Sequence, residues 1–253
     1  MTEVDWDERA RRGTGWQSVI DPADRSGLKN ALIDRIQWNH VGPWARQRRA
    51  VLDYGCGIGR FAERIGAFGA SYVGVDTSAE MIDAARRLHA GGPARFLHVP
   101  ALPMPLETAR FDGCLSVGVL QCLHAPGGAA LREACGELAR VVAPGGELLM
   151  IEQASASGRH SGSVSHSTSE QDYVDALAPW FDVVGRRRVR AGALSRASSA
   201  YARRGAGLPM RNWILAMLAR HEGRRIQSAD ADELRQLDYY DVAIRAVRRA
   251  EQR

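Results

Sequence analysis

The sequence predicts an α/β fold in which a mainly parallel sheet is covered by helices on both faces. Short apolar runs alternate along the chain with segments whose apolar residues recur at helical spacing, as expected for strands joined by crossover helices. One of these runs leads directly into a glycine-rich turn and then a helix, at residues 50–68. A chain of 253 residues with 45% hydrophobic and 25% charged residues is long enough for one such domain.

Each element follows from a local pattern. Apolar runs bounded by turn residues predict six strands, at residues 50–54, 72–75, 95–99, 111–117, 147–151 and 181–189. Helical spacing predicts intervening helices at residues 60–68, 78–90, 129–142 and 172–177. Ser78 is suited to cap the second of these helices, and Pro144-Gly145-Gly146 is expected to end the third.

The two ends of the chain differ from this alternation. Apolar residues at helical spacing and four tryptophans before residue 50 predict an N-terminal helical lid over residues 1–49. Residues 239–247 alternate in polarity and predict a final strand. The expected single domain therefore comprises the lid, a core at 50–190, a helical insertion at 191–237 with a helix at 210–220, and a last strand and tail at 238–253. The insertion is either a surface excursion or a cap over a substrate.

Composition excludes several classes of protein. The formal charge is +5, but Lys29 is the only lysine. Either basic residue can neutralise phosphate, so this preference for arginine indicates the codon usage of a GC-rich gene more than selection for phosphate contact. A nucleic-acid partner is therefore not favoured. The four cysteines lack zinc-ligand spacing, which predicts no metal site and fits a reducing cytoplasm. The longest apolar stretch, at 114–123, is too short for a membrane span, and the first residues do not form a signal peptide.

The glycine-rich turn, Gly55-Cys56-Gly57-Ile58-Gly59, is the most informative motif. Glycines allow a ligand to approach the backbone, and the helix that follows offers unpaired N–H groups. The third glycine of the dinucleotide fingerprint is replaced by Arg60, and no phosphate-binding Gly-Lys-Ser/Thr sequence follows. Asp53 precedes the turn, where a carboxylate disfavours a pyrophosphate and suits a cationic amino group.

A second acidic residue, Asp76, ends the next predicted strand, 23 positions after Asp53. A carboxylate at this spacing can accept hydrogen bonds from both hydroxyls of a ribose. It can equally serve the start of the helix that follows, and the two roles are compatible. The turn and this carboxylate together predict a nucleoside ligand that carries a cationic amino-acid tail.

Four stretches in the same order resemble class I S-adenosylmethionine (SAM)-dependent methyltransferases of the small-molecule, methyltransferase-11/25-like type. They are VLDYGCGIGR, YVGVDTSAEMIDAARR, LPMPLETARFDGCLSVGVLQCL and ELARVVAPGGELLMIE, within residues 50–152. The resemblance implies a Rossmann-like sheet of seven strands whose last strand is antiparallel. It also implies SAM as the cofactor, a cytoplasmic enzyme and the transfer of a methyl group.

The resemblance assigns cofactor contacts by position. The methionyl part of SAM is expected at Asp53, Gly55, Cys56 and Gly57, its ribose at Asp76, its adenine at Thr77, Met81, His98 and Val99, and the transfer region at Ser116 and Val117. Relatives have an aspartate where this chain has His98. The adenine contact therefore falls either to a ring nitrogen of His98 or to the backbone of Val99.

Methyl transfer needs alignment of the acceptor more than acid–base chemistry, because the methyl donor is already activated. A base is required where the acceptor atom carries a proton. His124 and Glu152 are the catalytic candidates, against the alternatives of a loop histidine and a structural carboxylate. Acceptor contacts are assigned, with less support from the residues, to Trp16, Gln121, His160 and His166.

The leading hypothesis is transfer of a methyl group to oxygen or nitrogen of a small molecule, such as a specialised metabolite. The alternatives are an RNA or protein methyltransferase, served by the arginine-rich carboxyl third, and a SAM-binding module without catalysis. Residues 116–119 lack the Asn/Asp-Pro-Pro-aromatic motif of enzymes that methylate DNA amino groups. The expected partner is a small-molecule acceptor, without nucleic acid or membrane, and the chain is compatible with a homodimer.

Overall fold

The computed structural model describes residues 5–12, 15, 18–123, 128–155, 168–204 and 210–250. Its centre is a seven-stranded sheet in the order β3-β2-β1-β4-β5-β7-β6. The strands are β1 (Ala50–Tyr54), β2 (Ser71–Asp76), β3 (Arg95–His98), β4 (Phe111–Val117), β5 (Val142–Ala154), β6 (Phe181–Ala191) and β7 (Tyr240–Arg248). β7 runs antiparallel to both of its neighbours, β5 and β6, and the other strand pairs are parallel, so the predicted mainly parallel sheet with an antiparallel last strand is confirmed.

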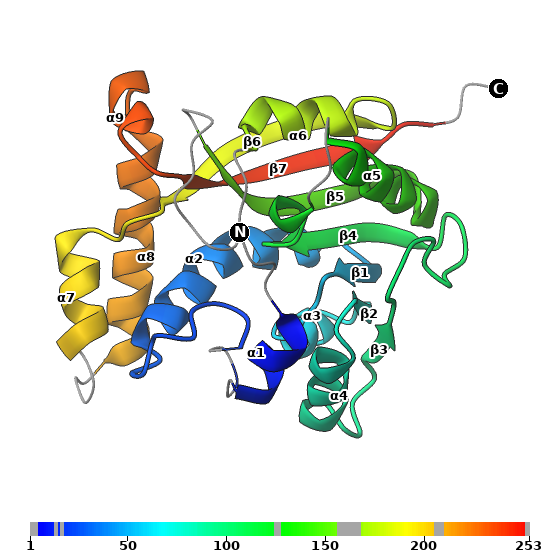
Figure 1. The fold of residues 1–253 in the computed structure, drawn as a ribbon, viewed down its shortest axis with the longest axis horizontal. Coiled ribbons are helices and arrows are strands. Elements are labelled where there is room, and N and C mark those ends of the chain that lie inside the picture. The colour runs from blue at the N-terminus through cyan, green and yellow to red at the C-terminus, as the bar shows by residue number, and fades with distance from the viewer. Residues whose placement is uncertain are drawn as a thin grey trace.

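Helices cover both faces of this sheet (Figure 1). One face packs against α2 (Leu28–Ala45), α3 (Ala62–Gly66), α4 (Ala79–Leu88), α7 (Arg196–Arg204) and α8 (Arg211–Gln227). The other packs against α5 (Ala129–Val141), α6 (Glu170–Leu177) and α9 (Ala231–Arg235). A further helix, α1 (Trp6–Arg12), lies beside α4. The apolar runs of the inner strands are buried because both faces are covered.

The strand register brings the glycine turn and the second acidic residue together. β1 and β2 are parallel, and Tyr54 at the end of β1 is the partner of Val75. The turn at Gly55 therefore begins beside Asp76, at the carboxyl edge of the sheet. Ligands of open parallel sheets bind at this edge, where neighbouring strands diverge.

Three predicted elements differ from the structure. The helix expected at residues 60–68 is shorter, and only the single turn α3 is helical. The helix α5 ends at Val141, before it reaches the segment Pro144–Gly146 that was expected to end it. That stop falls inside β5, where the pairing with β4 moves from Phe111–Val142 to Gly113–Glu147 through an irregularity. The predicted insertion contains three helices, α7, α8 and α9, where one was expected.

A run of arginines in β6 lies on an edge strand of the sheet. Arg186 and Arg187 are exposed, and such side chains discourage pairing with another sheet. Arg190 differs because it is buried, and its Nε lies 2.7 Å from Oδ2 of Asp241 on β7. No helix among the described residues is long and apolar enough to cross a membrane.

Candidate cofactor and active site

The glycine turn adopts a backbone that glycine favours. Gly55 has a φ of 70° and Gly57 a φ of 53°, in the left-handed region where a side chain is strained. The N–H groups of Gly55 and Cys56 both donate to the carbonyl of Val75, at 2.8 and 2.9 Å. A Cβ built on Gly57 would lie 2.6 Å from Cγ1 of Val19, which is too close. The turn is thus tied to β2 and leaves no room for a side chain.

The carboxylate of Asp76 joins this turn to the start of α4. Its Oδ2 accepts from the N–H of Gly57 at 2.8 Å, and its Oδ1 accepts from the N–H of Ser78 at 2.9 Å. Ser78 caps α4 through its Oγ, which accepts from the N–H of Met81 at 3.1 Å, as predicted. Burial raises the pKa of Asp76, and the N–H donors oppose this shift. Asp76 is therefore fixed in orientation at the edge of the cavity described next.

A cavity of about 480 Å³ opens beside the turn and Asp76. This volume is in the usual range for a small-molecule site. Its wall includes eight of the eleven predicted cofactor residues, namely Gly55, Cys56, Gly57, Asp76, Thr77, Met81, Val99 and Val117. The sheet edge and the start of α4 thus bring most of the predicted cofactor contacts to one place.

The other three cofactor candidates lie outside this wall. Asp53 is 3% exposed, and its Oδ2 accepts from the hydroxyl of Tyr72 at 2.5 Å. Burial raises the pKa of Asp53 to about 7, although the hydroxyl of Tyr72 and the charge of Arg60 act in the opposite direction. The Nε2 atom of the exposed His98 lies 3.1 Å from the carbonyl oxygen of Thr77. Ser116 is buried and bonded to Glu152.

Glu152, a catalytic candidate, is buried at the end of β5 and does not line the cavity. Its Oε1 accepts from Oγ of Ser116 at 2.8 Å, and its Oε2 accepts from the N–H of Gln121 at 3.2 Å. Burial raises its pKa to about 7, against these donors. Gln121 belongs to a short 3-10 helix, η2 (Leu120–Cys122), and its Oε1 accepts from the N–H of Gln153. These contacts fix η2 beside the cavity wall.

Four other candidates, His124, Trp16, His160 and His166, lie outside the described residues. Within the described part of the chain, no group of three or more His, Cys, Asp or Glu side chains could hold a metal ion. The four cysteines are free.

The sequence did not identify Arg60 and Glu133 as residues of the cavity wall. In the sequence, Arg60 stands out only because it replaces the third glycine of the dinucleotide fingerprint. In the structure it provides the one guanidinium group among the described residues of the wall. Its Nη1 lies 3.0 Å from Oδ1 of the buried Asp34 on α2. Glu133 lies on α5, where its exposed position gave no signal in the sequence.

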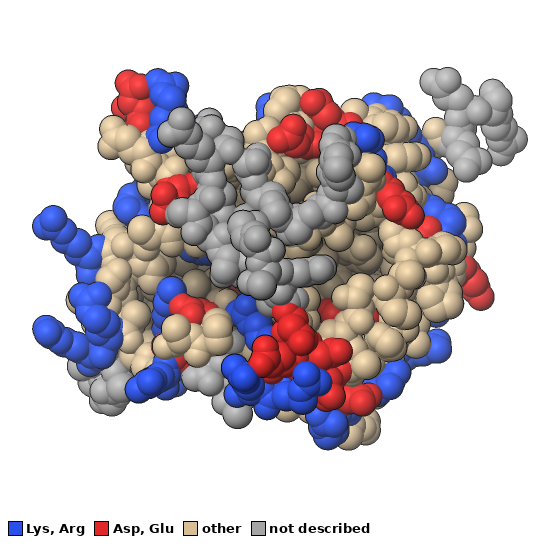
Figure 2. Space-filling view, viewed as in Figure 1, with Lys and Arg blue, Asp and Glu red and all other residues tan. Residues whose placement is uncertain are grey.

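The helix α1 lies against the start of α4 and closes one side of the cavity. Trp6 lines the wall, and Oδ1 of Asp7 accepts from Oγ of Ser78 at 2.5 Å. Figure 2 shows acidic and basic side chains mixed around α1 and α4, where Arg11 pairs with Glu80. The hydroxyl of Ser78 thus couples the N-terminal helix to the cap of α4.

The comparisons with known proteins agree with this geometry. A sequence family described as a methyltransferase domain matches residues 52–150. A methyltransferase of Mycobacterium ulcerans is 38% identical over 98 residues, which are 39% of this chain and 36% of that protein. The malonyl-[acyl-carrier protein] O-methyltransferase of Erwinia billingiae is 36% identical over 130 residues, 50% of this chain and 49% of that protein. The chain thus spans less than half of the length of these curated relatives.

The similarity of fold extends further than the similarity of sequence. The geranyl diphosphate C-methyltransferase of Streptomyces coelicolor, solved with S-adenosyl-L-homocysteine, superposes with a TM-score of 0.59 and 15% identity. The superposition covers 97% of this chain and 98% of that one. At this identity the match establishes the fold and leaves the substrate open.

Proposed function

Because this chain carries a class I SAM-dependent methyltransferase domain, we propose that it transfers a methyl group to an oxygen or nitrogen atom of a small molecule. The observation that carries the proposal is the distribution of charge in the 480 Å³ cavity. Its three charged side chains among the described residues are Asp76, Arg60 and Glu133. Two of these lie at the glycine turn, where the cofactor is expected. The part of the wall that follows β4, at residues 117–119, 122 and 123, is uncharged.

The residues present fit the cofactor. The turn presents bare backbone to the cavity, because Gly55 and Gly57 both line its wall and carry no side chain. The fixed carboxylate of Asp76 suits the ribose hydroxyls, and Thr77, Met81 and Val99 suit the adenine. Arg60 would hold the carboxylate of the methionyl tail, since a guanidinium pairs well with a carboxylate. The cofactor supplies an activated methyl group when bound.

The chain's own contribution is to align the acceptor and exclude water. The wall beside η2 would receive the acceptor. Glu152 would position this wall through its hydrogen bonds with Ser116 and Gln121. This arrangement favours a positioning role for Glu152 over direct proton transfer. The general base, where the acceptor needs one, is assigned to His124, with Glu133 as the carboxylate within the described wall.

We assign the role of a lid to residues 1–49, whereas residues 191–237 form a helical insertion none of whose described residues lines the cofactor cavity. The lid is supported by α1, which is fixed to α4 by Asp7 and contributes Trp6 to the wall. Residues 50–190 and 238–253 then form the sheet that holds the cofactor, within one domain. The homodimer stays a prediction.

Methyl transfer can be tested with small-molecule extracts as a source of acceptors. Purified protein and SAM are incubated with fractionated extract, and S-adenosylhomocysteine and a product heavier by one methylene are followed by mass spectrometry. At a limiting SAM concentration we expect both products with wild type and far less of each with Asp76→Ala. Formation of product only with RNA or protein would establish the alternative enzyme class. Binding of S-adenosylhomocysteine without any product would indicate a cofactor-binding module.

A further inference from the structure

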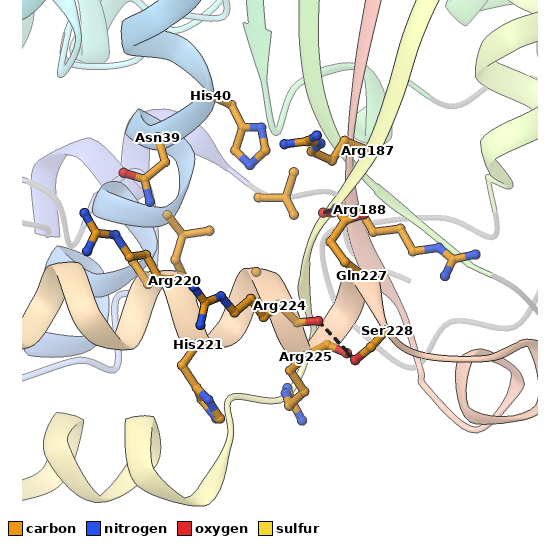
Figure 3. Close-up of a pocket in the computed structure, with 14 residues that line it drawn as sticks. Asn39, His40, Arg187, Arg188, Arg220, His221, Arg224, Arg225, Gln227 and Ser228 are labelled. Atoms are coloured by element: carbon orange, nitrogen blue, oxygen red, sulfur yellow. Dashed lines mark hydrogen bonds between the residues drawn. The ribbon is translucent and has the colours of Figure 1, made fainter.

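A second and larger cavity, of about 820 Å³, lies between α2, β6 and α8, away from the glycine turn (Figure 3). It shares no lining residue with the cofactor cavity. Buried apolar side chains, Ile36, Val189 and Ala219, form part of its wall. The rest is basic, with five arginines and two histidines and no acidic side chain among the described lining residues. A concave wall of one charge concentrates the electrostatic field within it.

Two of the five arginines already have a partner for their guanidinium groups. Nη2 of Arg225 lies 3.2 Å from Oε2 of the buried Glu222, and Nη1 of Arg188 donates to the carbonyl of Ala229 at 3.0 Å. In Figure 3 the side chain of Arg188 points away from the middle of the cavity. These two arginines therefore contribute less to the charge that a ligand would meet.

The other three arginines, Arg187, Arg220 and Arg224, have no ion pair or side-chain hydrogen bond among the described residues. Arg220 and Arg224 are one turn apart on α8, and Arg187 comes from the edge strand β6. Three positive charges around one concave space repel each other, and a bound anion would relieve that repulsion.

The imidazole of His40 is sensitive to the positive charge of Arg187. It projects from α2 toward the guanidinium group of Arg187, which lies beside it (Figure 3). Its pKa is lowered to about 4, first by burial and then by the positive charge of Arg187. The imidazole is therefore neutral at pH 7, and a nearby anion would raise its pKa by favouring the charged form.

We propose that this cavity is a binding site for a triphosphate group. A triphosphate carries three to four negative charges, which match the three unpaired guanidinium groups, and a guanidinium can bind two phosphate oxygens at once. The three exposed guanidinium groups line one concave site, which suits a compact group of phosphates better than an extended nucleic-acid backbone. The triphosphate belongs either to an inorganic polyphosphate or to a nucleotide, and the buried apolar residues beside it would favour a nucleotide.

Calorimetry on the complete chain with two probes, sodium tripolyphosphate and ATP, tests the proposal. We expect micromolar binding by wild type and at least tenfold weaker binding by the double variant Arg187→Gln/Arg224→Gln. The matched control is Arg87→Gln/Arg95→Gln, two exposed arginines remote from the cavity, which should bind as wild type does. Tighter binding of ATP would assign the nucleotide as the source, and tighter binding of tripolyphosphate would assign inorganic polyphosphate.

Titration of wild type followed by NMR gives a readout that needs no folded double variant. The His40 imidazole signals, assigned with His40→Gln, should shift with tripolyphosphate and show a raised pKa. The absence of binding by both probes would overturn the proposal, as would equal affinities of the two double variants. Binding of single-stranded RNA in place of both probes would overturn it in favour of a nucleic-acid surface. Affinity for S-adenosylhomocysteine, which Arg187→Gln/Arg224→Gln should retain, separates this result from the proposed methyl transfer.

Discussion

The hydroxyl of Tyr72 donates a hydrogen bond of 2.5 Å to the carboxylate of Asp53, and both side chains are buried. The two residues lie on neighbouring parallel strands, two positions apart in register. The acidic residue that opens the glycine-rich motif is thus held within the core by a phenol.

Replacing this phenol should destabilise the fold. Tyr72→Phe removes the donor, which raises the pKa of Asp53 above its value of about 7 and leaves a buried carboxyl without that partner. We expect a loss of about 1–2 kcal/mol in the free energy of unfolding, measured by chemical denaturation. Tyr201→Phe is the control, because its buried hydroxyl has no hydrogen-bond partner among the described residues. Equal losses in the two variants would contradict the prediction.

Removing the second carboxylate should weaken cofactor binding. Asp76→Ala deletes the carboxylate that we assign to the ribose and that accepts from the N–H groups of Gly57 and Ser78. We expect calorimetry to show a loss of about 2 kcal/mol, or roughly 30-fold, in the affinity for S-adenosylhomocysteine. Asp83→Ala changes an exposed carboxylate on α4 and should bind as wild type does. An unchanged affinity in Asp76→Ala would place the ribose elsewhere.

A side chain at the glycine turn should affect both folding and binding. Gly57→Ala introduces strain at a φ of 53° and a contact with Val19, whereas Gly69→Ala introduces strain at a φ of 83° with no atom nearby. Each should cost about 1 kcal/mol of stability, measured by denaturation. Gly57→Ala alone should also lower the affinity for S-adenosylhomocysteine by at least tenfold. The prediction fails if both variants bind equally well.

The buried Glu152 should make stability depend on pH. Its pKa of about 7 in the folded state exceeds the ordinary value of 4.5, so between these values the folded state binds more protons than the unfolded state. Stability should therefore fall as the pH rises from about 4.5 to 7, by up to roughly 1.4 kcal/mol per pH unit from this group. Asp53 adds to the fall in the same direction.

Glu152→Gln should remove its part of this slope, seen in denaturation curves collected at several pH values. Glu133→Gln, at an exposed position on α5, should keep the wild-type slope. Parallel stability profiles for wild type and Glu152→Gln would show that Glu152 is not protonated preferentially in the folded state.

The sequence predicted the inner strands well because burial on both faces leaves a continuous apolar run. The bounds of β1 and β4 were predicted without error for this reason. The helices of the insertion carried a weaker signal. In α7 only Ser198 and Tyr201 are buried, so its surface residues show no apolar stripe.

The location of Asp53 needed the structure. Alternation along β1 turns Asp53 to the face that also holds Val51, whereas Leu52 and Tyr54 belong to the opposite face. A glycine-rich motif indicates that a ligand approaches the backbone, but it does not reveal on which side the preceding carboxylate lies. In the same way, the burial of Glu152 depends on η2, which no pattern in the sequence indicated.

The long connection between β6 and β7 lies at the edge of the sheet that is farther from the glycine turn. Ala191 pairs directly with Tyr240, so a tight turn would join these two strands, yet the chain uses residues 192–239 for this purpose. The sheet order places this connection at the opposite edge from β2 and its carboxyl-terminal Asp76. A change in the length of this segment would therefore leave the strands that carry the glycine turn and Asp76 in place.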